Sequence, residues 1–301
     1  MLKVVHHPEY DAPTVADSHR FPMRKYSALA DHLQAVGLVH AGNPFVEPEP
    51  AAFEALIRAH DEAYVRGCLD LTLDRKAQRT IGFELTDAVV RRSRLSCAGS
   101  ALAGRIALDE GVACSAAGGS HHAKRSGGAG FCVFNDVAVA ICQLRAEGLI
   151  QSALVIDCDV HQGDGTADIF RNDPTVFTLS LHCETNWPVR KVASDLDVGL
   201  EENLEDAAYL RALDNALDEV FAMFQPDIVF YNAGVDPHRD DRLGKLALSD
   251  QGIRHRDERV LSRVRDRAWP VVGVLGGGYS RDVAHLARLH ASLFDAASMI
   301  R

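Results

Sequence analysis

A short acidic stretch, VIDCDVHQGDG at residues 155–165, holds the residues whose types and spacing are best suited to chemistry. Asp157, Asp159 and His161 are spaced two residues apart, so an extended chain projects all three to one side. The apolar residues before them indicate burial, and buried carboxylates are costly unless a positive group compensates them. The pattern therefore favours a cation held by Asp159 and His161 over a solvated loop. Cys158 points the other way and is expected in the core.

A third acidic ligand is available in NAGVDP, residues 232–237, which follows another apolar segment. Taken alone, Asp236 is typical of a turn aspartate before a proline. Together with Asp159 and His161 it gives two carboxylates and one imidazole with open coordination positions, which is the pattern of a catalytic rather than a structural zinc site. Iron(II) accepts the same ligands, so the donor set predicts zinc, with iron(II) as the alternative.

Two adjacent histidines, His121 and His122, lie on the glycine-rich segment GGSHHA. Lone histidines are often structural, but a tandem pair directly after an apolar segment favours a catalytic role. A metal held by two anions acidifies its water less strongly than one held by three neutral histidines, so a separate base is needed. Asp157 and Asp164 remain as partners that orient the two imidazoles.

Two further glycine-rich segments follow this pattern. LGGGY, residues 275–279, ends the last apolar segment, and its tyrosine hydroxyl could hold a developing oxyanion. The alternative is a helix-entry loop with an incidental Tyr279. GGAGF, residues 127–131, leaves two interpretations equally open, because Phe131 either walls a narrow apolar channel or packs in the core.

The elements that must position these residues are strands and helices in alternation. Apolar segments of strand length occur at 2–5, 38–40, 112–115, 153–156, 176–181, 228–231 and 271–275. Segments with helical periodicity lie at 86–110, 135–147, 206–224, 249–266 and 281–299. This order predicts an α/β fold with a central parallel sheet flanked by helices on both faces. The polar residues then meet at the carboxyl ends of the strands.

No linker, repeat or low-complexity tract divides the chain, so residues 1–301 are expected to form a single domain. The first eighty residues are less regular and are predicted to form either a lid or a flanking layer. Thr86 is the expected N-cap of the first long helix, and Gly111 is expected to end it.

Composition limits the classes of partner. The formal net charge is −10 at pH 7, which gives no electrostatic footprint for direct nucleic-acid binding and would tolerate or attract cationic substrates. The seven scattered cysteines form no C-x-x-C pair, so neither a disulfide framework nor a thiolate zinc site is indicated. The N-terminus has no apolar signal region and no stretch reaches membrane-spanning length, so we expect a cytoplasmic protein without a membrane partner.

Six motifs in a fixed order, GGSHHA, GFCVFND, DCDVHQGDGT, SLH, NAGVD and LGGGY, resemble the histone deacetylase family. The segments HPEYD, HRFPMRKY and NAGVDPHRDDRLG are most similar to class IV and related bacterial members, and the resemblance runs from about His7 to Ser280. It implies a single-domain arginase/deacetylase fold with a parallel sheet of about eight strands. It also implies hydrolysis of N-acyl amines, usually acyl-lysine, by metal-activated water.

The resemblance assigns a role to each residue of the catalytic centre. The zinc ligands are matched by Asp159, His161 and Asp236. The two catalytic histidines are matched by His121 and His122, and their carboxylate partners by Asp157 and Asp164 respectively. The oxyanion tyrosine is matched by Tyr279. Of the two histidines, His122 is the expected base.

The resemblance also implies a structural potassium ion and an acyl-lysine tunnel. The potassium ligands are side-chain and main-chain oxygens of Asp157, Asp159, His161, Ser180 and Leu181. Gly130 and Phe131 match tunnel-lining residues, and Gly277 is expected to contact the substrate as well.

The sequence departs from the family pattern around the tunnel. Ser120 stands where an aromatic residue is frequent, and the loop CETNWPVRK lacks the Phe-Phe-Pro-Gly run, which leaves Trp187 as the candidate second wall. No residue matches the carboxylate that grips the substrate backbone in some members. The substrate therefore stays open between an acyl-lysine protein or peptide and a small acylated amine such as an acetylpolyamine. A catalytically silent binding protein is less favoured, and the oligomeric state is undetermined.

Overall fold

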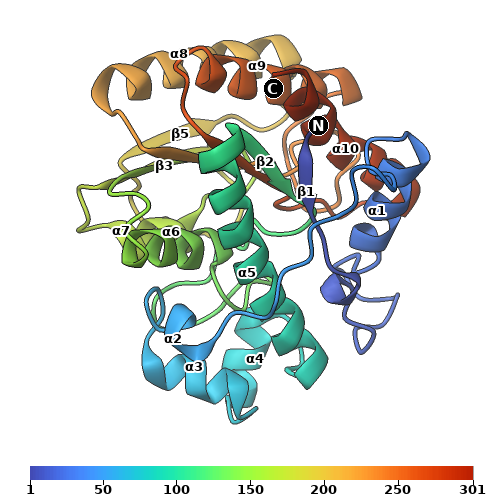
Figure 1. Ribbon diagram of the computed structural model, residues 1–301, viewed down its shortest axis with the longest axis vertical. Helices are drawn as coiled ribbons and strands as arrows, with labels where there is room; N and C mark the ends of the chain where they lie inside the picture. The colour runs from blue at the N-terminus through green and yellow to red at the C-terminus, as the bar shows by residue number, and fades with distance from the viewer. Residues whose placement is uncertain (301) are drawn as a thin grey trace.

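Seven strands pair into one parallel sheet in the computed structural model, which describes residues 1–300 (Figure 1). Their order across the sheet is β1-β2-β7-β6-β3-β4-β5. The strands are β1 (Lys3–Val5), β2 (Val112–Ser115), β3 (Ala153–Asp157), β4 (Val176–Cys183), β5 (Leu196–Leu200), β6 (Ile228–Asn232) and β7 (Val271–Val274). Every residue of β3, β6 and β7 is buried, because helices cover both faces of the sheet.

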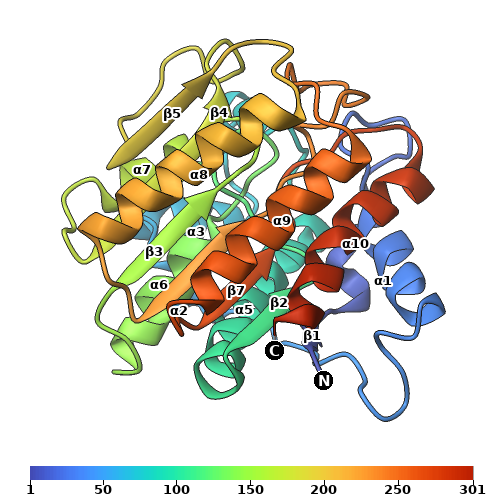
Figure 2. The same ribbon diagram turned by 90° about the horizontal axis from the view of Figure 1, so that it is seen from above.

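Two groups of long helices form these covering layers (Figures 1 and 2). One face packs against α8 (Asp206–Met223), α9 (Asp250–Arg265) and α10 (Val283–Met299). The other face packs against α5 (Asp87–Glu110) and α7 (Asp164–Phe170), with α6 (Asp136–Ala146) between those two helices. The Thr86 side chain caps α5 by accepting a hydrogen bond from the Val89 amide, and Gly111, at φ 88°, ends the helix as predicted.

The first eighty residues form short helices that pack against the long ones. These are the 3₁₀ turn η1 (Pro8–Tyr10), α1 (Lys25–Ala35), α2 (Phe53–Leu56), α3 (Glu62–Leu69) and α4 (Arg75–Ile81). Helix α1 lies along α10, whereas α2 and α3 contact α6 and α5 (Figure 1). This segment is therefore a flanking layer, and none of the helices within residues 1–300 is both long and apolar enough to cross a membrane.

The direction of strand addition reverses between β3 and β6. From β3 the chain adds β4 and β5 on one side, whereas β6 and β7 lie on the other. Asp157, the last residue of β3, is in register with Asn232 of β6 and Ser180 of β4. Ligand sites in open parallel sheets form at such a switch point, outside the carboxyl ends of the strands.

The structure confirms the predicted α/β class, the parallel sheet and the five long helices. The predicted strand at 38–40 is wrong: the amides of Leu38 and Val39 both bond to the Leu33 carbonyl, so this segment closes the end of α1. The sheet has seven strands rather than about eight, and sequence patterning missed β5. That strand lies at the sheet edge and alternates half-buried with exposed residues, the exposed ones being Asp197 and Gly199, so it has no continuous apolar run.

Candidate active site

The loops after β3 and β6 bring the three predicted metal ligands together. The Nδ1 atom of His161 lies 3.0 Å from an oxygen of Asp159 and 3.0 Å from an oxygen of Asp236. Three possible ligand atoms, one from each residue, all lie within 4.8 Å of one another, and all three residues are buried. Two carboxylates and an imidazole at this spacing are a suitable donor set for a divalent cation.

Backbone amides hold the two carboxylates in place. The Val160 amide donates to Asp236 at 2.9 Å, and the Gly277 amide donates to Asp159 at 2.6 Å. A Cβ atom at position 277 would collide with both carboxylates, so only glycine permits this approach. Cys158, between the ligands in sequence, is fully buried as predicted, and burial raises the pKa of its thiol to about 12.

The electrostatics of this cluster favour a bound cation. Burial and then the neighbouring Asp159 carboxylate raise the pKa of Asp236 above its ordinary range. A cation placed between the two carboxylates would relieve both penalties. The residues present therefore fit a divalent metal ion at this position.

The two tandem histidines lie beside the ligand cluster, with ring centroids 4.0 Å apart. His121 Nδ1 is 2.6 Å from an Asp157 oxygen, and His122 Nδ1 is 2.7 Å from an Asp164 oxygen. The structure thus pairs each histidine with the carboxylate that the sequence predicted. In both rings Nε2 is the atom left for chemistry.

The two histidines differ in charge. Burial opposes a charge on His121, but the carboxylates of Asp157 and Asp159 outweigh it and raise its pKa to about 9. For His122, burial and the charge of His121 dominate over Asp164 and lower the pKa to about 3. The pair therefore combines an imidazolium with a neutral imidazole at neutral pH.

Tyr279 completes the group from the segment that follows β7. Its ring centroid is 6.1 Å from that of His161, and its backbone amide donates to an Asp241 oxygen at 2.7 Å. The same Asp241 carboxylate accepts the amides of Leu243 and Gly244, which fixes one loop against another. Burial raises the pKa of Tyr279 well above its usual range, so the hydroxyl stays a proton donor.

A pocket of about 610 Å³ leads from the surface to these side chains. His122, His161 and Tyr279 lie among its lining residues, together with Phe131 and Trp187. The Trp187 ring lies 4.5 Å from the His122 ring, measured between centroids. Both aromatic residues that the sequence proposed as tunnel walls therefore border the same pocket.

Gly130 is required where the walls come closest. Its φ is 54°, and an added Cβ would lie 2.6 Å from the His122 ring and 2.8 Å from the Trp187 ring. Those distances leave no room for a side chain. Cys132, two residues later, is buried, and burial raises its pKa to about 12, so it behaves as a small core residue.

The residues expected to hold potassium surround the end of β3. Ser180 is the register partner of Asp157, and its hydroxyl lies 3.0 Å from His182 Nδ1. Asp157 accepts the Asp159 amide at 3.1 Å and the Asn232 side-chain amide at 2.9 Å. The carbonyls of Asp159, His161 and Leu181 belong to the same two segments after β3 and within β4.

Two buried cations near the site were not predicted from the sequence. Lys25 is fully buried and donates to the Gly276 carbonyl at 2.9 Å, which ties α1 to the glycine-rich segment before Tyr279. Arg256 on α9 is also fully buried and donates to the carbonyls of Cys158, Ala233 and Gly234. The only sequence signal for Lys25 was its place in the HRFPMRKY segment.

A second histidine–aspartate group, His238, Asp250 and His285, is also close enough to suggest a metal. However, His238 Nδ1 accepts the Asp240 amide at 3.1 Å, so Nε2 carries the proton in the neutral ring. That proton faces an Asp250 oxygen at 3.0 Å, and a protonated nitrogen offers no lone pair to a metal. This group is a hydrogen-bonded link between the loop after β6, α9 and α10.

Comparison with known proteins gives the same family over nearly the whole chain. The model of the histone deacetylase domain matches residues 19–296. Histone deacetylase 2 of Arabidopsis thaliana is 30% identical over 277 residues, which cover 89% of this chain and 71% of the relative. An uncharacterised protein of Picosynechococcus is 44% identical and covers 98% of this chain and 97% of its own. A probable deacetylase of Archaeoglobus fulgidus is 28% identical, with 92% and 81% covered.

Solved structures agree on the fold. An HDAC homologue complexed with SAHA superposes with a TM-score of 0.83 at 25% identity, covering 99% of this chain and 88% of its own. An acetylpolyamine aminohydrolase from Burkholderia pseudomallei gives a TM-score of 0.79 over the full length of both chains, and at 21% identity it bears on the fold alone. The chain therefore belongs to the histone deacetylase family and is a hydrolase that acts on amides.

Proposed function

We propose that this protein is a metal-dependent deacetylase that removes short acyl groups from lysine side chains of proteins or peptides. One observation carries the proposal. His122, His161 and Tyr279 lie together at the pocket of about 610 Å³, with the other two candidate ligands directly behind His161. A pocket that reaches the proposed metal ligands suits a long, thin substrate arm such as acyl-lysine.

Asp159, His161 and Asp236 are the proposed metal ligands. A zinc or iron(II) ion held there would supply the Lewis acid that activates water and polarises the acyl carbonyl. The donor set favours zinc as the first candidate, with iron(II) as the alternative. Asp157 and Ser180, with carbonyls of Asp159, His161 and Leu181, are proposed to hold a structural potassium ion beside it.

The protein side chains divide the proton transfers between them. His122, neutral because of burial and its charged neighbour, accepts the water proton at Nε2 while Asp164 holds its Nδ1. An imidazolium then protonates the nitrogen of the departing amine, and this imidazolium is either His122 after the first transfer or His121. The lysine leaves as a neutral amine and afterwards takes up a further proton from water. The Tyr279 hydroxyl donates a hydrogen bond to the developing oxyanion.

The space beyond the proposed reaction centre favours a short acyl group. A small hollow is lined by Phe21, Tyr26 and Arg92 together with His121 and Tyr279. Its free volume is about 20 Å³, which holds little more than one water molecule. Forcing a longer chain into such a packed region costs about 1–3 kcal/mol. Acetyl-lysine is therefore expected to exceed octanoyl- and myristoyl-lysine by about 5- to 150-fold in kcat/KM.

The test is hydrolysis of one peptide that carries acetyl-, butyryl-, octanoyl- or myristoyl-lysine, beside acetylspermidine as the small-amine alternative. We expect the acetyl peptide to be the best substrate and a chelated sample to be inactive until zinc is returned. Turnover of acetylspermidine alone would replace the lysine substrate with small amines. No turnover of any compound by protein with bound zinc would overturn the proposed function.

A further inference from the structure

The mouth of the pocket is surrounded by arginine side chains. Two of them, Arg20 and Arg79, line the pocket together with His122, His161 and Tyr279. Adjoining hollows add five more, of which Arg24 is paired with Asp17. We call the other six the arginine rim: Arg20, Arg75, Arg79, Arg190, Arg242 and Arg281. All six are exposed, and within residues 1–300 no acidic group forms an ion pair with any of them.

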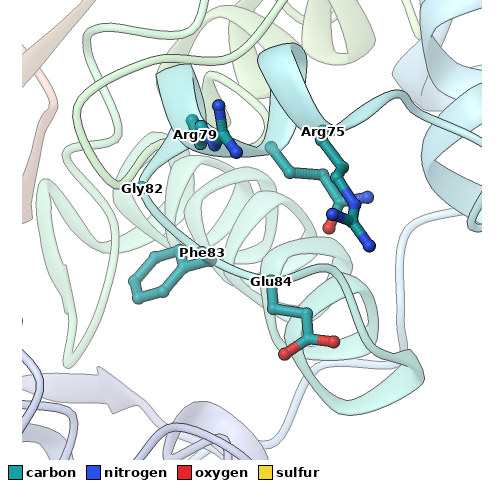
Figure 3. A pocket seen from close by; sticks show the side chains of 6 residues that line it. Arg75, Arg79, Gly82, Phe83 and Glu84 are labelled. Carbon is teal, nitrogen blue, oxygen red and sulfur yellow. The ribbon is translucent and has the colours of Figure 1, made fainter.

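Few acidic residues line the hollows that hold these arginines. Three acids line the same hollows, and two of these are already engaged: Asp17 faces Arg24 at 4.0 Å, and Asp164 bonds to His122 and Lys124. The third, Glu84, lies across a hollow from Arg75 and Arg79, as Figure 3 shows. Among the residues that line these hollows, six unpaired arginines therefore lie with one unpaired carboxylate, on a chain whose net charge is −10.

Part of the rim is attached rigidly to the pocket wall. The amides of Gly130 and Phe131 donate to the carbonyls of Thr80 and Ile81, at 3.1 and 2.6 Å, so the end of α4 is joined to the wall. His19 Nε2 lies 3.0 Å from the Gly82 carbonyl, which joins the segment of Arg20 to the same point. Arg20 and Arg79 are thus held on either side of one hydrogen-bonded junction at the mouth.

We propose that the arginine rim selects acyl-lysines that are flanked by aspartate or glutamate in an extended protein segment. This inference rests on the proposed function, because the flanking residues reach the rim only when the acyl-lysine side chain occupies the pocket. In an extended segment, residues one to three positions from the acyl-lysine lie about 3–10 Å along the chain and would pass over the rim. The local charge also corrects the expectation from net charge, since cationic acetylpolyamines would meet a surface of like sign.

The test compares three acetyl-lysine peptides that differ only in the four flanking residues, which are acidic, uncharged or basic. Exposed ion pairs contribute about 1.5- to fivefold each, so two or three pairs predict roughly tenfold higher kcat/KM for the acidic than for the basic peptide. Raising sodium chloride from 0.1 to 0.5 M should reduce that ratio through screening. The Arg20→Gln/Arg79→Gln double variant should lower the ratio about threefold to tenfold.

Arg211→Gln is the control, because Arg211 is an exposed arginine on α8, outside the rim. Its replacement removes one positive charge, as does the replacement of each rim arginine. Its ratio should equal that of the wild type. Equal kcat/KM for all three peptides, or a preference that survives in the double variant, would overturn the rim proposal while the deacetylase stands. Absence of turnover on every peptide would instead show that the proposed function itself has failed.

Discussion

At the scale of single residues, the site depends on a difference between two neighbouring imidazoles. His121 lies against Asp157, with Asp159 also near, and its pKa rises to about 9, whereas burial and the charge of His121 lower that of His122 to about 3. Adjacent groups whose environments move their pKa values apart are suited to different proton-transfer roles. The difference follows from which carboxylates surround each ring, so sequence adjacency alone does not reveal it.

This assignment predicts that His122→Gln and Asp236→Asn fail in different ways. Loss of a general base typically lowers kcat about 10²–10⁴-fold, and His122→Gln should do so while keeping its metal. Asp236→Asn removes a ligand and should lose the metal itself. Metal analysis of both purified variants beside kcat measurements separates these outcomes. Wild-type kcat in His122→Gln would contradict the role given to this residue.

That the candidate site residues lie together could be predicted, because they lie at or just past the ends of continuous apolar segments. Asp159, His161 and Asp236 lie just past β3 and β6, where a parallel sheet collects its strand ends. Lys25 and Arg256 were not predictable in the same way. A charged residue within a helix is usually solvated, and only the packed structure shows that these two side chains reach buried carbonyls.

At the scale of elements, Arg256 connects α9 to the segments after β3 and β6, which carry the proposed metal ligands. Its guanidinium donates to carbonyls in the segments after β3 and β6 and pairs with the buried carboxylate of Asp257. Asp257 in turn accepts hydrogen bonds from Tyr231 and Ser292. The fully buried network fixes the two loops relative to each other.

Replacing Arg256 with methionine should therefore destabilise the fold as well as the site. Removing one partner of a buried ion pair costs about 3–5 kcal/mol, because the Asp257 carboxylate is left without its cation. Arg254→Met is the matched control, since Arg254 lies on the same helix but is exposed and pairs only with Glu258. Urea unfolding should show a large loss for the first variant and little change for the second. Equal stability of the two variants would show that the buried network around Arg256 does not stabilise the fold.

The elements themselves show where sequence patterning succeeds. Helix α5 could be placed from its Thr86 cap, its periodicity and Gly111, because these signals are local. The edge strand β5 could not, since it alternates and is specified by pairing with β4. The segment at 38–40 looked like a strand because its residues are apolar, but they cover the end of α1 instead.

At the scale of the whole molecule, the buried His60 joins the flanking layer to the sheet domain. His60 Nδ1 lies 2.9 Å from the Lys124 carbonyl, and its Nε2 accepts the amide of Asn135, the residue that caps α6. Burial lowers the pKa of His60 to about 4, and burial with the charge of His7 does the same for His6. Both rings are therefore neutral in the folded protein.

These two histidines predict a loss of stability in mild acid. In the unfolded chain each takes up a proton near pH 6.5, but in the folded protein only near pH 4. Between these values the unfolded chain binds more protons, so the free energy of unfolding falls as the pH falls, by about 3 kcal/mol for each histidine. Urea unfolding at several pH values between 7 and 4 measures this dependence.

His60→Gln should make the pH dependence shallower, whatever its effect on stability at pH 7. His255→Gln, which replaces an exposed histidine on α9, is the control and should leave the dependence unchanged. The same slope in all three proteins would show that His60 does not contribute to acid sensitivity.

We expect Tyr279 and a metal held by Asp159, His161 and Asp236 to act together in the cleavage of acetyl-lysine. The most direct test is the kcat for an acetyl-lysine peptide with zinc-loaded wild type and Tyr279→Phe, measured at equal metal content. Loss of one oxyanion donor predicts a fall of about 10²–10³-fold, with bound zinc unchanged. A Tyr279→Phe enzyme as fast as the wild type would exclude the proposed role of this hydroxyl, and a zinc-loaded wild type that releases no acetate would exclude the deacetylase activity.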